Sequence, residues 1–268
     1  MNKVVLITGI SSGFGKCTAE LLAAKGYTVY GTVRRPCEHD PRVSVLQMDV
    51  TDAASVQGGV DAILSKEGRI DALVNNAGFS VTGAIEDATM EEIRLQMDTN
   101  FGGICHTVHA VLPAMRRQGS GTIVNIGSIG GLMGLPFQGL YSASKFAVDG
   151  FSEALRMEVK QFNISVVLVN PGDFRTPFTS NRKLVARAGK GSVYDAQFKE
   201  TLAVIEKDET GGLKPIVLAR KIHSILEKRK PRPRYVVASL KQRLAVVLRY
   251  ILPDSWLFKI LEAHYRIK

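Results

Sequence analysis

Three residues in the middle of the chain have the types and spacing of an acid–base site. Tyr141 and Lys145 are four residues apart, a spacing that places two side chains on the same face of a helix. The ordinary pKa of tyrosine is about 10, and a nearby ammonium group lowers it by favouring the phenolate. Ser128, 13 residues before Tyr141, can add a hydroxyl group to the same site. We therefore expect a proton donor and acceptor that is usable near neutral pH.

A glycine-rich turn near the start of the chain has the composition of a phosphate-binding loop. The segment Thr8–Gly15 reads TGISSGFG and lies between an apolar run at 4–8 and a helical pattern at 17–24. Glycine allows a tight turn and lets backbone N–H groups approach a pyrophosphate at a helix N-terminus. The spacing Gly-x-x-x-Gly-x-Gly departs from the Gly-x-Gly-x-x-Gly fingerprint. We interpret the turn as a binding site for an anionic cofactor.

Strand and helix patterns alternate along most of the chain. Apolar, β-branched runs predict strands at 4–8, 27–33, 43–48, 71–74, 122–126, 164–169 and 235–237. Apolar periodicity and caps, Asp52 among them, predict helices at 17–24, 52–66, 90–117, 139–161 and 215–228. Such units imply an α/β fold: one Rossmann-like domain over 1–268, with a doubly wound parallel sheet of about seven strands and helices on both faces. Ligands of such sheets bind at the carboxyl ends of the strands, where the turn and Ser128 would meet.

Further motifs follow the same strands. Asn75-Asn76-Ala77-Gly78 follows the fourth predicted strand, Asp49-Val50 follows the third, and Pro171-Gly172 follows the sixth, with Thr176 shortly after. Together with the glycine turn and Tyr-x-x-x-Lys, these motifs resemble the short-chain dehydrogenase/reductase family over Thr8–Thr176, about two-thirds of the chain. The C-terminal part resembles the 17β-hydroxysteroid and retinol dehydrogenase-like branch of that family.

The resemblance implies a role for each matching residue. Tyr141 would exchange a proton with the substrate oxygen during hydride transfer, and Ser128 would hydrogen-bond that oxygen. Lys145 would bind the nicotinamide ribose and lower the pKa of Tyr141, and Asn100 would hold a water of the proton relay. The residues expected to bind the cofactor are Gly9, Ser11, Ser12, Gly13, Phe14, Gly15, Arg34, Arg35, Asp49, Val50, Asn75, Asn76, Ala77, Gly78, Tyr141, Lys145, Pro171, Gly172 and Thr176.

The end of the second predicted strand indicates which nicotinamide cofactor is bound. An NAD enzyme usually carries an acidic residue there, which holds the ribose 2′-hydroxyl. This strand ends in Thr32-Val33-Arg34-Arg35, without a carboxylate that would repel a 2′-phosphate. Arginine is well shaped to pair with phosphate. The sequence therefore predicts NADP(H).

Two segments predict the substrate side. Residues 129–140 are nearly free of polar side chains and would wall an apolar cavity. Residues 179–212 correspond to the family's variable substrate lid. They include the cations Arg182, Lys183, Arg187 and Lys190, followed by the apolar residues Phe198, Leu202, Val204 and Ile205. We expect the protein to interconvert a ketone or aldehyde with an alcohol on a bulky, steroid-like hydrophobic substrate. The cations of the lid leave open whether this substrate also has an acidic tail.

Two other functions fit the sequence less well. A catalytically inactive NADP-binding regulator or scaffold would not need Ser128, Tyr141, Lys145 and Asn100 together. A sugar-nucleotide epimerase favours a different glycine spacing and a longer substrate domain. The oxidoreductase is therefore the preferred interpretation.

Composition limits the partners. The net charge is +10, and a basic block at 228–234 has no accompanying nucleic-acid motif, so we expect a solvated basic face and no nucleic acid. Three cysteines without a Cys-x-x-Cys pair, and His106 and His109 without a third ligand beside them, predict neither disulfides nor a metal site. The first apolar run is too short for a signal peptide, and we expect a cytoplasmic protein.

The last residues extend past the shared core. Leu240, Leu244, Val247 and Ile251 repeat at helical spacing, and Pro253 separates them from a second helical pattern. We expect this C-terminal helical extension, 240–268, to pack on the lid or on another subunit, with a weak membrane-surface contact as the alternative. The resemblance also implies a homodimer or homotetramer, formed through the helices at 90–117 and 139–161.

Overall fold

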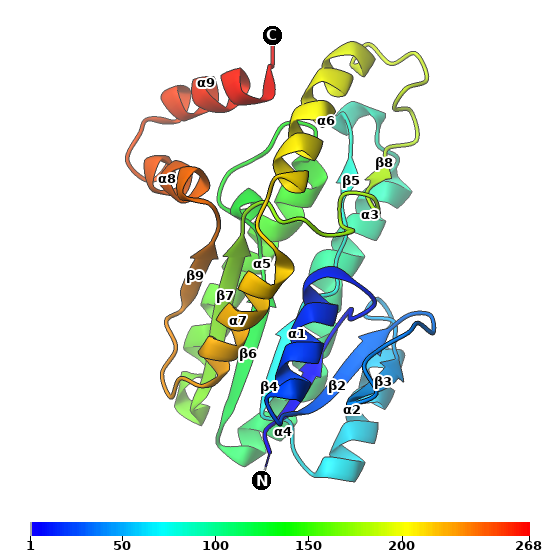
Figure 1. Ribbon diagram of the computed structural model, residues 1–268, viewed down its shortest axis with the longest axis vertical. Coiled ribbons are helices and arrows are strands. Elements are labelled where there is room, and N and C mark those ends of the chain that lie inside the picture. Colours follow the sequence, from blue (N-terminus) through cyan, green and yellow to red (C-terminus); the bar gives the residue numbers. More distant parts are fainter. Residues whose placement is uncertain (1) are drawn as a thin grey trace.

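Seven parallel strands form one sheet in the computed structural model, which describes residues 2–268 (Figure 1). The order across the sheet is β3-β2-β1-β4-β6-β7-β9. The strands are β1 (Val4–Ile7), β2 (Thr28–Val33), β3 (Val43–Gln47), β4 (Ala72–Asn75), β6 (Gly121–Ile126), β7 (Ile164–Pro171) and β9 (Arg234–Val237). The predicted doubly wound parallel sheet is confirmed, and the strand order reverses beside β1. A separate parallel pair, β5 (Val81–Thr82) with β8 (Lys183–Leu184), was not predicted.

Both faces of the sheet are apolar and covered by helices. In β1, Leu6 belongs to one buried cluster and Ile7 to the other, because successive side chains of a strand point to opposite faces. The Leu6 face is covered by α2 (Ala53–Glu67), α4 (Gly103–Gln118) and α5 (Gly139–Glu158). The Ile7 face is covered by α1 (Gly13–Ala24) and α7 (Pro215–Leu226). The predicted N-cap of α2 is confirmed, since Asp52 accepts hydrogen bonds from two backbone N–H groups of the first turn.

The predicted helix at 90–117 is interrupted. It consists of α3 (Met90–Met97), a π-helical segment at Asp98–Gly102, and α4. A π-helical segment adds a residue to the helical turn and is common near functional sites. Here it carries the fully buried Asn100. The polar partners of Asn100 lie on two other segments of the chain, and apolar periodicity does not reveal them.

Three helices from the last third of the chain gather at one end of the molecule, beyond the sheet (Figure 1). They are α6 (Asp195–Thr210), α8 (Leu240–Arg249) and α9 (Asp254–Tyr265). The hydroxyl group of Thr201 on α6 donates a hydrogen bond to the backbone oxygen of Tyr265, 3.0 Å away. The C-terminal extension thus contacts the predicted lid. No helix in residues 2–268 combines the length and apolarity that crossing a bilayer requires.

Candidate active site

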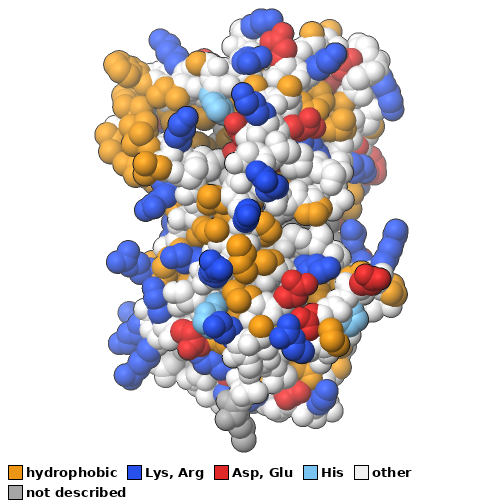
Figure 2. All heavy atoms as spheres, in the orientation of Figure 1, with side chains coloured by type: hydrophobic (Ala, Val, Ile, Leu, Met, Phe, Trp, Pro, Cys, Tyr) orange, Lys and Arg blue, Asp and Glu red, His pale blue; other side chains and the backbone are white. Residues whose placement is uncertain are grey.

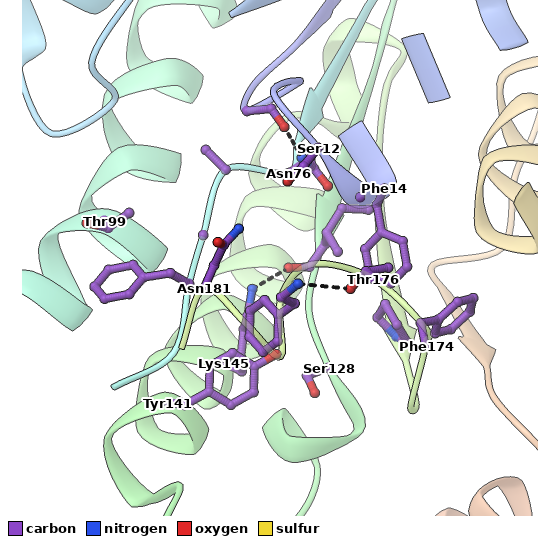
Figure 3. Close-up of a pocket in the computed structure, with 18 of the residues that line it drawn as sticks. Ser12, Phe14, Asn76, Thr99, Ser128, Tyr141, Lys145, Phe174, Thr176 and Asn181 are labelled. Atoms are coloured by element: carbon purple, nitrogen blue, oxygen red, sulfur yellow. Dashed lines mark hydrogen bonds between the residues drawn. The ribbon is translucent and has the colours of Figure 1, made fainter. Parts of the chain in front are cut away.

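A cavity of about 590 Å³ opens at the carboxyl ends of the central strands. This volume is typical of a small-molecule site. Figure 3 shows Ser12, Phe14 and Asn76 around one part of it, and Ser128, Tyr141 and Lys145 around another. Most predicted site residues line the cavity: Gly9, Ser11, Ser12, Gly13, Phe14, Arg34, Asp49, Val50, Asn76, Ala77, Gly78, Ser128, Tyr141, Lys145, Pro171, Gly172 and Thr176.

The glycine turn is shaped by two kinds of constraint. Gly9 and Gly13 have φ of +71° and +56°, in the left-handed region that favours glycine. A Cβ on Gly15 would lie 2.1 Å from the backbone oxygen of Gly9, so no other residue fits there. Gly15 is not among the described residues that line the cavity. Its role is to let the start of α1 pack closely against the backbone of Gly9. The helix α1 begins at Gly13, and Ser12, Gly13 and Phe14 at its N-terminus line the cavity, a position suited to an anion.

The second asparagine of the Asn75-Asn76 pair holds this turn in place. The Asn76 Nδ2 donates to the backbone oxygens of Thr8 and Gly9, at 2.9 and 2.8 Å. Asn75 points away from the cavity: its Nδ2 donates to Asn125 Oδ1 at 2.8 Å, and its Oδ1 accepts from Thr107 Oγ1 at 2.7 Å. Buried amides need such partners, so the side chain of Asn75 serves the core rather than a cofactor.

One of the two arginines at the end of β2 reaches the cavity. Arg34 lines it beside Asp49 and Val50, and its guanidinium makes no ion pair with any residue in 2–268. Arg35 is exposed and is not among the described lining residues, because the chain turns away toward Pro36. Burial opposes ionisation of Asp49, but hydrogen bonds from Thr51 keep the pKa of that carboxyl below its ordinary value.

The three acid–base candidates meet at the ends of β6 and α5. Ser128 follows β6 and is 8% exposed, and its Oγ accepts a hydrogen bond from the Gly130 N–H at 3.0 Å. Tyr141 and Lys145 lie in the first two turns of α5. The Lys145 Nζ donates to the backbone oxygen of Ile126 at 2.8 Å and lies 5.7 Å from the centre of the Tyr141 ring.

The pKa values of this group differ from the sequence-based expectation. Burial, with a smaller contribution from the carboxylates of Glu209 and Asp173, raises the pKa of Tyr141 to about 12 against the lowering effect of the Ser128 hydroxyl. Burial also lowers the pKa of Lys145 to about 8. The expected lowering of the tyrosine pKa is absent from this structure, because desolvation and two nearby carboxylates disfavour the phenolate.

Asn100 supports the site from behind. Its Nδ2 donates to the backbone oxygen of Phe79 at 2.9 Å and to Ser144 Oγ at 3.1 Å, and its Oδ1 accepts from the Phe79 N–H at 3.0 Å. Both amide donors are therefore used within the protein. Asn100 does not line the cavity in the described chain, and it contacts α5 at the residue next to Lys145.

The substrate side contains residues that the sequence analysis missed. The carboxyl groups of Asp173, Asp208 and Glu209 line the cavity together with the Tyr265 side chain. Burial, reinforced by Asp208 and Glu209, raises the pKa of Asp173 to about 6. Ile205, Asp208 and Glu209 have the spacing of residues on one helical face, and this spacing could have indicated that they line the same cavity. No sequence pattern indicates that Tyr265 lies in the cavity, because it is distant in the chain from the other lining residues.

The predicted lid cations do not serve this cavity. The side chain of Arg182 is buried and pairs with Glu209 at 2.6 Å. Lys183, Arg187 and Lys190 are not among the described lining residues. The apolar contribution of the 129–140 loop is present, with Ile129 and Leu135 in the cavity wall. The cations that would bind an acidic tail of the substrate are therefore not in the cavity wall, and the structure does not favour such a tail.

Phe174 lies in the segment that follows β7. It is buried and packs edge-to-face on Phe14, with ring centres 4.8 Å apart. Phe14 belongs to the glycine turn, so this pair joins the turn to the segment after β7. Thr176 also lines the cavity, close enough that a Cβ on Gly13 would lie 3.6 Å from its own Cβ.

The comparison with known proteins agrees with this geometry. Residues 3–185 match the family model described as short chain dehydrogenase. The chain belongs to the short-chain dehydrogenase/reductase family. It lies close to the retinol and hydroxysteroid dehydrogenase-like branch, and it is an oxidoreductase that acts on alcohol and carbonyl groups.

Three relatives cover nearly the whole chain. It is 47% identical to 3-ketodihydrosphingosine reductase of Bacteroides thetaiotaomicron over 266 residues, 99% of each chain. It is 31% identical to NADPH-dependent 3-dehydrocapnine reductase of Ornithobacterium rhinotracheale, covering 96% of this chain and 95% of that one. A crystal structure of a short-chain dehydrogenase from Streptomyces avermitilis superposes with a TM-score of 0.82 at 32% identity, covering 98% and 96%.

Proposed function

We propose that this protein is an NADPH-dependent reductase of a long-chain 2-amino-3-ketone, the keto form of a sphingoid base. The observation that carries the proposal is the makeup of the cavity. It joins Ser128 and Tyr141 to an apolar wall and to carboxyl groups at one end. The two relatives whose names specify a ketone reductase support the same substrate class.

The cofactor half of the cavity fits NADPH. The left-handed glycines and the N-terminus of α1 form a cradle for a pyrophosphate, and Arg34 can pair with a 2′-phosphate. Pro171, Gly172 and Thr176 would line the nicotinamide end, and Lys145 would hold the nicotinamide ribose. When bound, NADPH supplies the hydride.

The acid–base residues then complete the reduction. Ser128 would donate a hydrogen bond to the ketone oxygen and orient the carbonyl carbon toward the hydride donor. Tyr141 is protonated at neutral pH because its pKa is about 12, and it would give that proton to the oxygen as the alkoxide forms. Asn100 would act as a positioning residue through Ser144 rather than through contact with the substrate.

The substrate half of the cavity suits a cation next to a ketone. Asp173 and Glu209 lie near enough to Tyr141 to raise its pKa, so a ketone at Tyr141 would place a neighbouring ammonium group beside carboxylates. Arg182 offsets the charge of Glu209, which leaves Asp173 as the group best able to accept the ammonium. An alkyl chain would follow the apolar side chains Ile129 and Leu135.

NADPH oxidation at 340 nm tests this function with four ketones. We expect the largest kcat/KM for 3-ketodihydrosphingosine, and values at least about tenfold lower for its N-acetyl form, for an alkan-3-one of equal length and for a steroid ketone. A charged hydrogen bond accounts for a difference of this size. A preference for the steroid ketone would overturn the substrate class, and no turnover with any ketone would favour the inactive alternative.

A substitution separates recognition of the amine from catalysis. Asp173→Asn should raise KM for the amino ketone about tenfold and leave the ratio of kcat values for the amino ketone and the alkan-3-one unchanged. Glu206→Gln removes a carboxylate from the lid helix α6, at a position outside the described cavity lining, and serves as the control. An equal loss with both ketones would mean that Asp173 does not recognise the amine.

A further inference from the structure

The C-terminal helices leave a large apolar surface in contact with solvent. Its members, here called the C-terminal patch, are Leu240, Leu244, Val247, Tyr250, Ile251, Trp256, Phe258 and Ile260, each between 46% and 82% exposed. In Figure 2 hydrophobic side chains gather over the region of α8 and α9, at the upper left of the molecule. Large contiguous apolar surfaces of this kind mark interaction sites.

The segment that carries the patch is also basic. Residues 240–268 contain six Lys and Arg against two Asp and Glu, a net charge of +4. Figure 2 shows Lys and Arg side chains around the apolar region and along the edge below it. A patch of this composition is complementary to a surface that is apolar inside and negatively charged at its rim.

The patch is held in place rather than loosely attached. On its inner side, Val246 of α8 is 7% exposed and packs with Leu132 and Met133 of the loop that follows Ser128. Leu257 of α9 is 2% exposed. The Ser239 side chain caps α8 in a capping box with Gln242. Two short helices therefore present their outer sides from a fixed platform.

We propose that the C-terminal patch docks the protein on the surface of an anionic lipid bilayer. An amphipathic helix with an apolar face and surrounding Lys and Arg lies in the interface between lipid headgroups and acyl chains. Trp256 and Tyr250 are the residue types that favour this interface. A second copy of the chain is disfavoured as the occupant, because a symmetric contact would oppose two surfaces that each carry the +4 charge of residues 240–268.

The docked orientation places the lipid near the active site. Tyr265, at the end of α9, lines the cavity, and so do Ile129 and Leu135 of the loop beneath the patch. A water-insoluble ketone can then pass from the bilayer to the cavity over a short distance. This consequence rests on the proposed function, whereas the docking does not.

The single tryptophan of the sequence makes the docking directly observable. Trp256 is 64% exposed and lies within the patch. With vesicles of phosphatidylcholine containing 30% phosphatidylglycerol, its emission should shift to shorter wavelength, and brominated lipid should quench it. Phosphatidylcholine vesicles without the anionic lipid should produce at least about tenfold weaker binding, because several Lys and Arg near the surface contribute.

Two sets of substitutions divide the apolar and electrostatic contributions. Replacing Lys241, Arg243 and Lys259 by Gln should weaken vesicle binding about a hundredfold, at about fivefold for each cation. Leu244→Gln with Ile260→Gln should abolish sedimentation with vesicles, and Val193→Gln with Val217→Gln is the control, since both of these apolar residues are exposed elsewhere. Reduction of a short, water-soluble ketone should stay unchanged in all of them, which shows that they are folded.

Either of two results would overturn the proposal. If Trp256 emission and sedimentation do not respond to anionic vesicles, the patch does not dock on lipid. If Trp256 emission shifts with protein concentration in the absence of lipid, while light scattering shows association, the patch binds a second copy. Failure of docking with normal reduction of 3-ketodihydrosphingosine in detergent would leave the proposed function intact.

Discussion

At the scale of single residues, the site combines a buried phenol with a buried amine. Burial raises the pKa of Tyr141 to about 12 and lowers that of Lys145 to about 8. Both shifts favour the uncharged forms of the two side chains, as desolvation requires. A protonated tyrosine is the form needed to donate to an alkoxide, so this arrangement suits reduction of a ketone.

The first prediction concerns that proton. Tyr141→Phe should lower turnover by at least about 10²-fold, the usual scale for a lost general acid, and leave NADPH binding nearly unchanged. Steady-state kinetics and fluorescence titration of NADPH measure the two effects separately. Near-normal turnover would remove Tyr141 from the mechanism.

A second prediction concerns cofactor choice. Arg34 lines the cavity at the end of β2, without a carboxylate at that strand end to repel a 2′-phosphate. NADPH should bind at least about tenfold tighter than NADH, and Arg34→Ala should remove most of this difference while NADH binding changes little. Arg35→Ala is the control, because Arg35 lies outside the described lining. Equal affinities of the wild-type protein for the two cofactors would contradict the assignment.

At the scale of elements, a buried polar network joins β9 to the site. Arg234 on β9 pairs with Asp149 of α5, and it donates to Asn170 Oδ1 at 3.2 Å. The Asn170 Nδ2 in turn donates to the backbone oxygen of Ser128 at 2.9 Å. The last strand of the sheet thus helps to hold the residue that the proposed mechanism places on the substrate oxygen.

The third prediction follows from this network. Arg234→Leu should lower the free energy of unfolding by about 2–4 kcal/mol, because it leaves the carboxylate of Asp149 buried without its partner. Adding Asp149→Asn should restore part of that stability, since the unpaired charge is removed. Urea unfolding of both variants measures the effect. A change below about 0.5 kcal/mol in the single variant would show that the pair is solvated.

At the scale of the whole molecule, α5 has an exposed apolar face of its own. Phe146 and Met157 are 45% and 72% exposed, and they lie far along the chain from the C-terminal patch. The family resemblance predicts that this helix and α4 pair subunits. A symmetric contact through α5 would bury these two side chains in both subunits, because each subunit contributes the same surface.

The fourth prediction is the oligomeric state. Light scattering at micromolar concentration, without lipid, should find a dimer or a tetramer, and Phe146→Glu should shift the protein toward smaller species by burying a charge in the contact. Leu244→Gln, in the C-terminal patch, should leave the mass unchanged. A wild-type protein that stays monomeric would contradict the predicted contact.

The chain order of motifs was sufficient to predict the sheet and most of the candidate site. Each motif follows a strand that is apolar on both faces, and the carboxyl ends of parallel strands meet at one edge. The sequence alone was therefore enough to place Ser128, Tyr141 and the glycine turn together at this edge of the sheet. The same reasoning assigned Asn75 to the cofactor, because a motif does not tell which of two adjacent amides faces inward.

Tertiary structure decided the features that depend on residues distant in the chain. Tyr265 and Glu209 reach the cavity only because α9 and α6 fold back over the strand ends. The high pKa of Tyr141 has the same origin, since desolvation and the nearby carboxylates exist only after folding. Local periodicity describes which face of a segment is apolar, but it does not describe what that face meets, and the electrostatics of a buried site are set by what it meets.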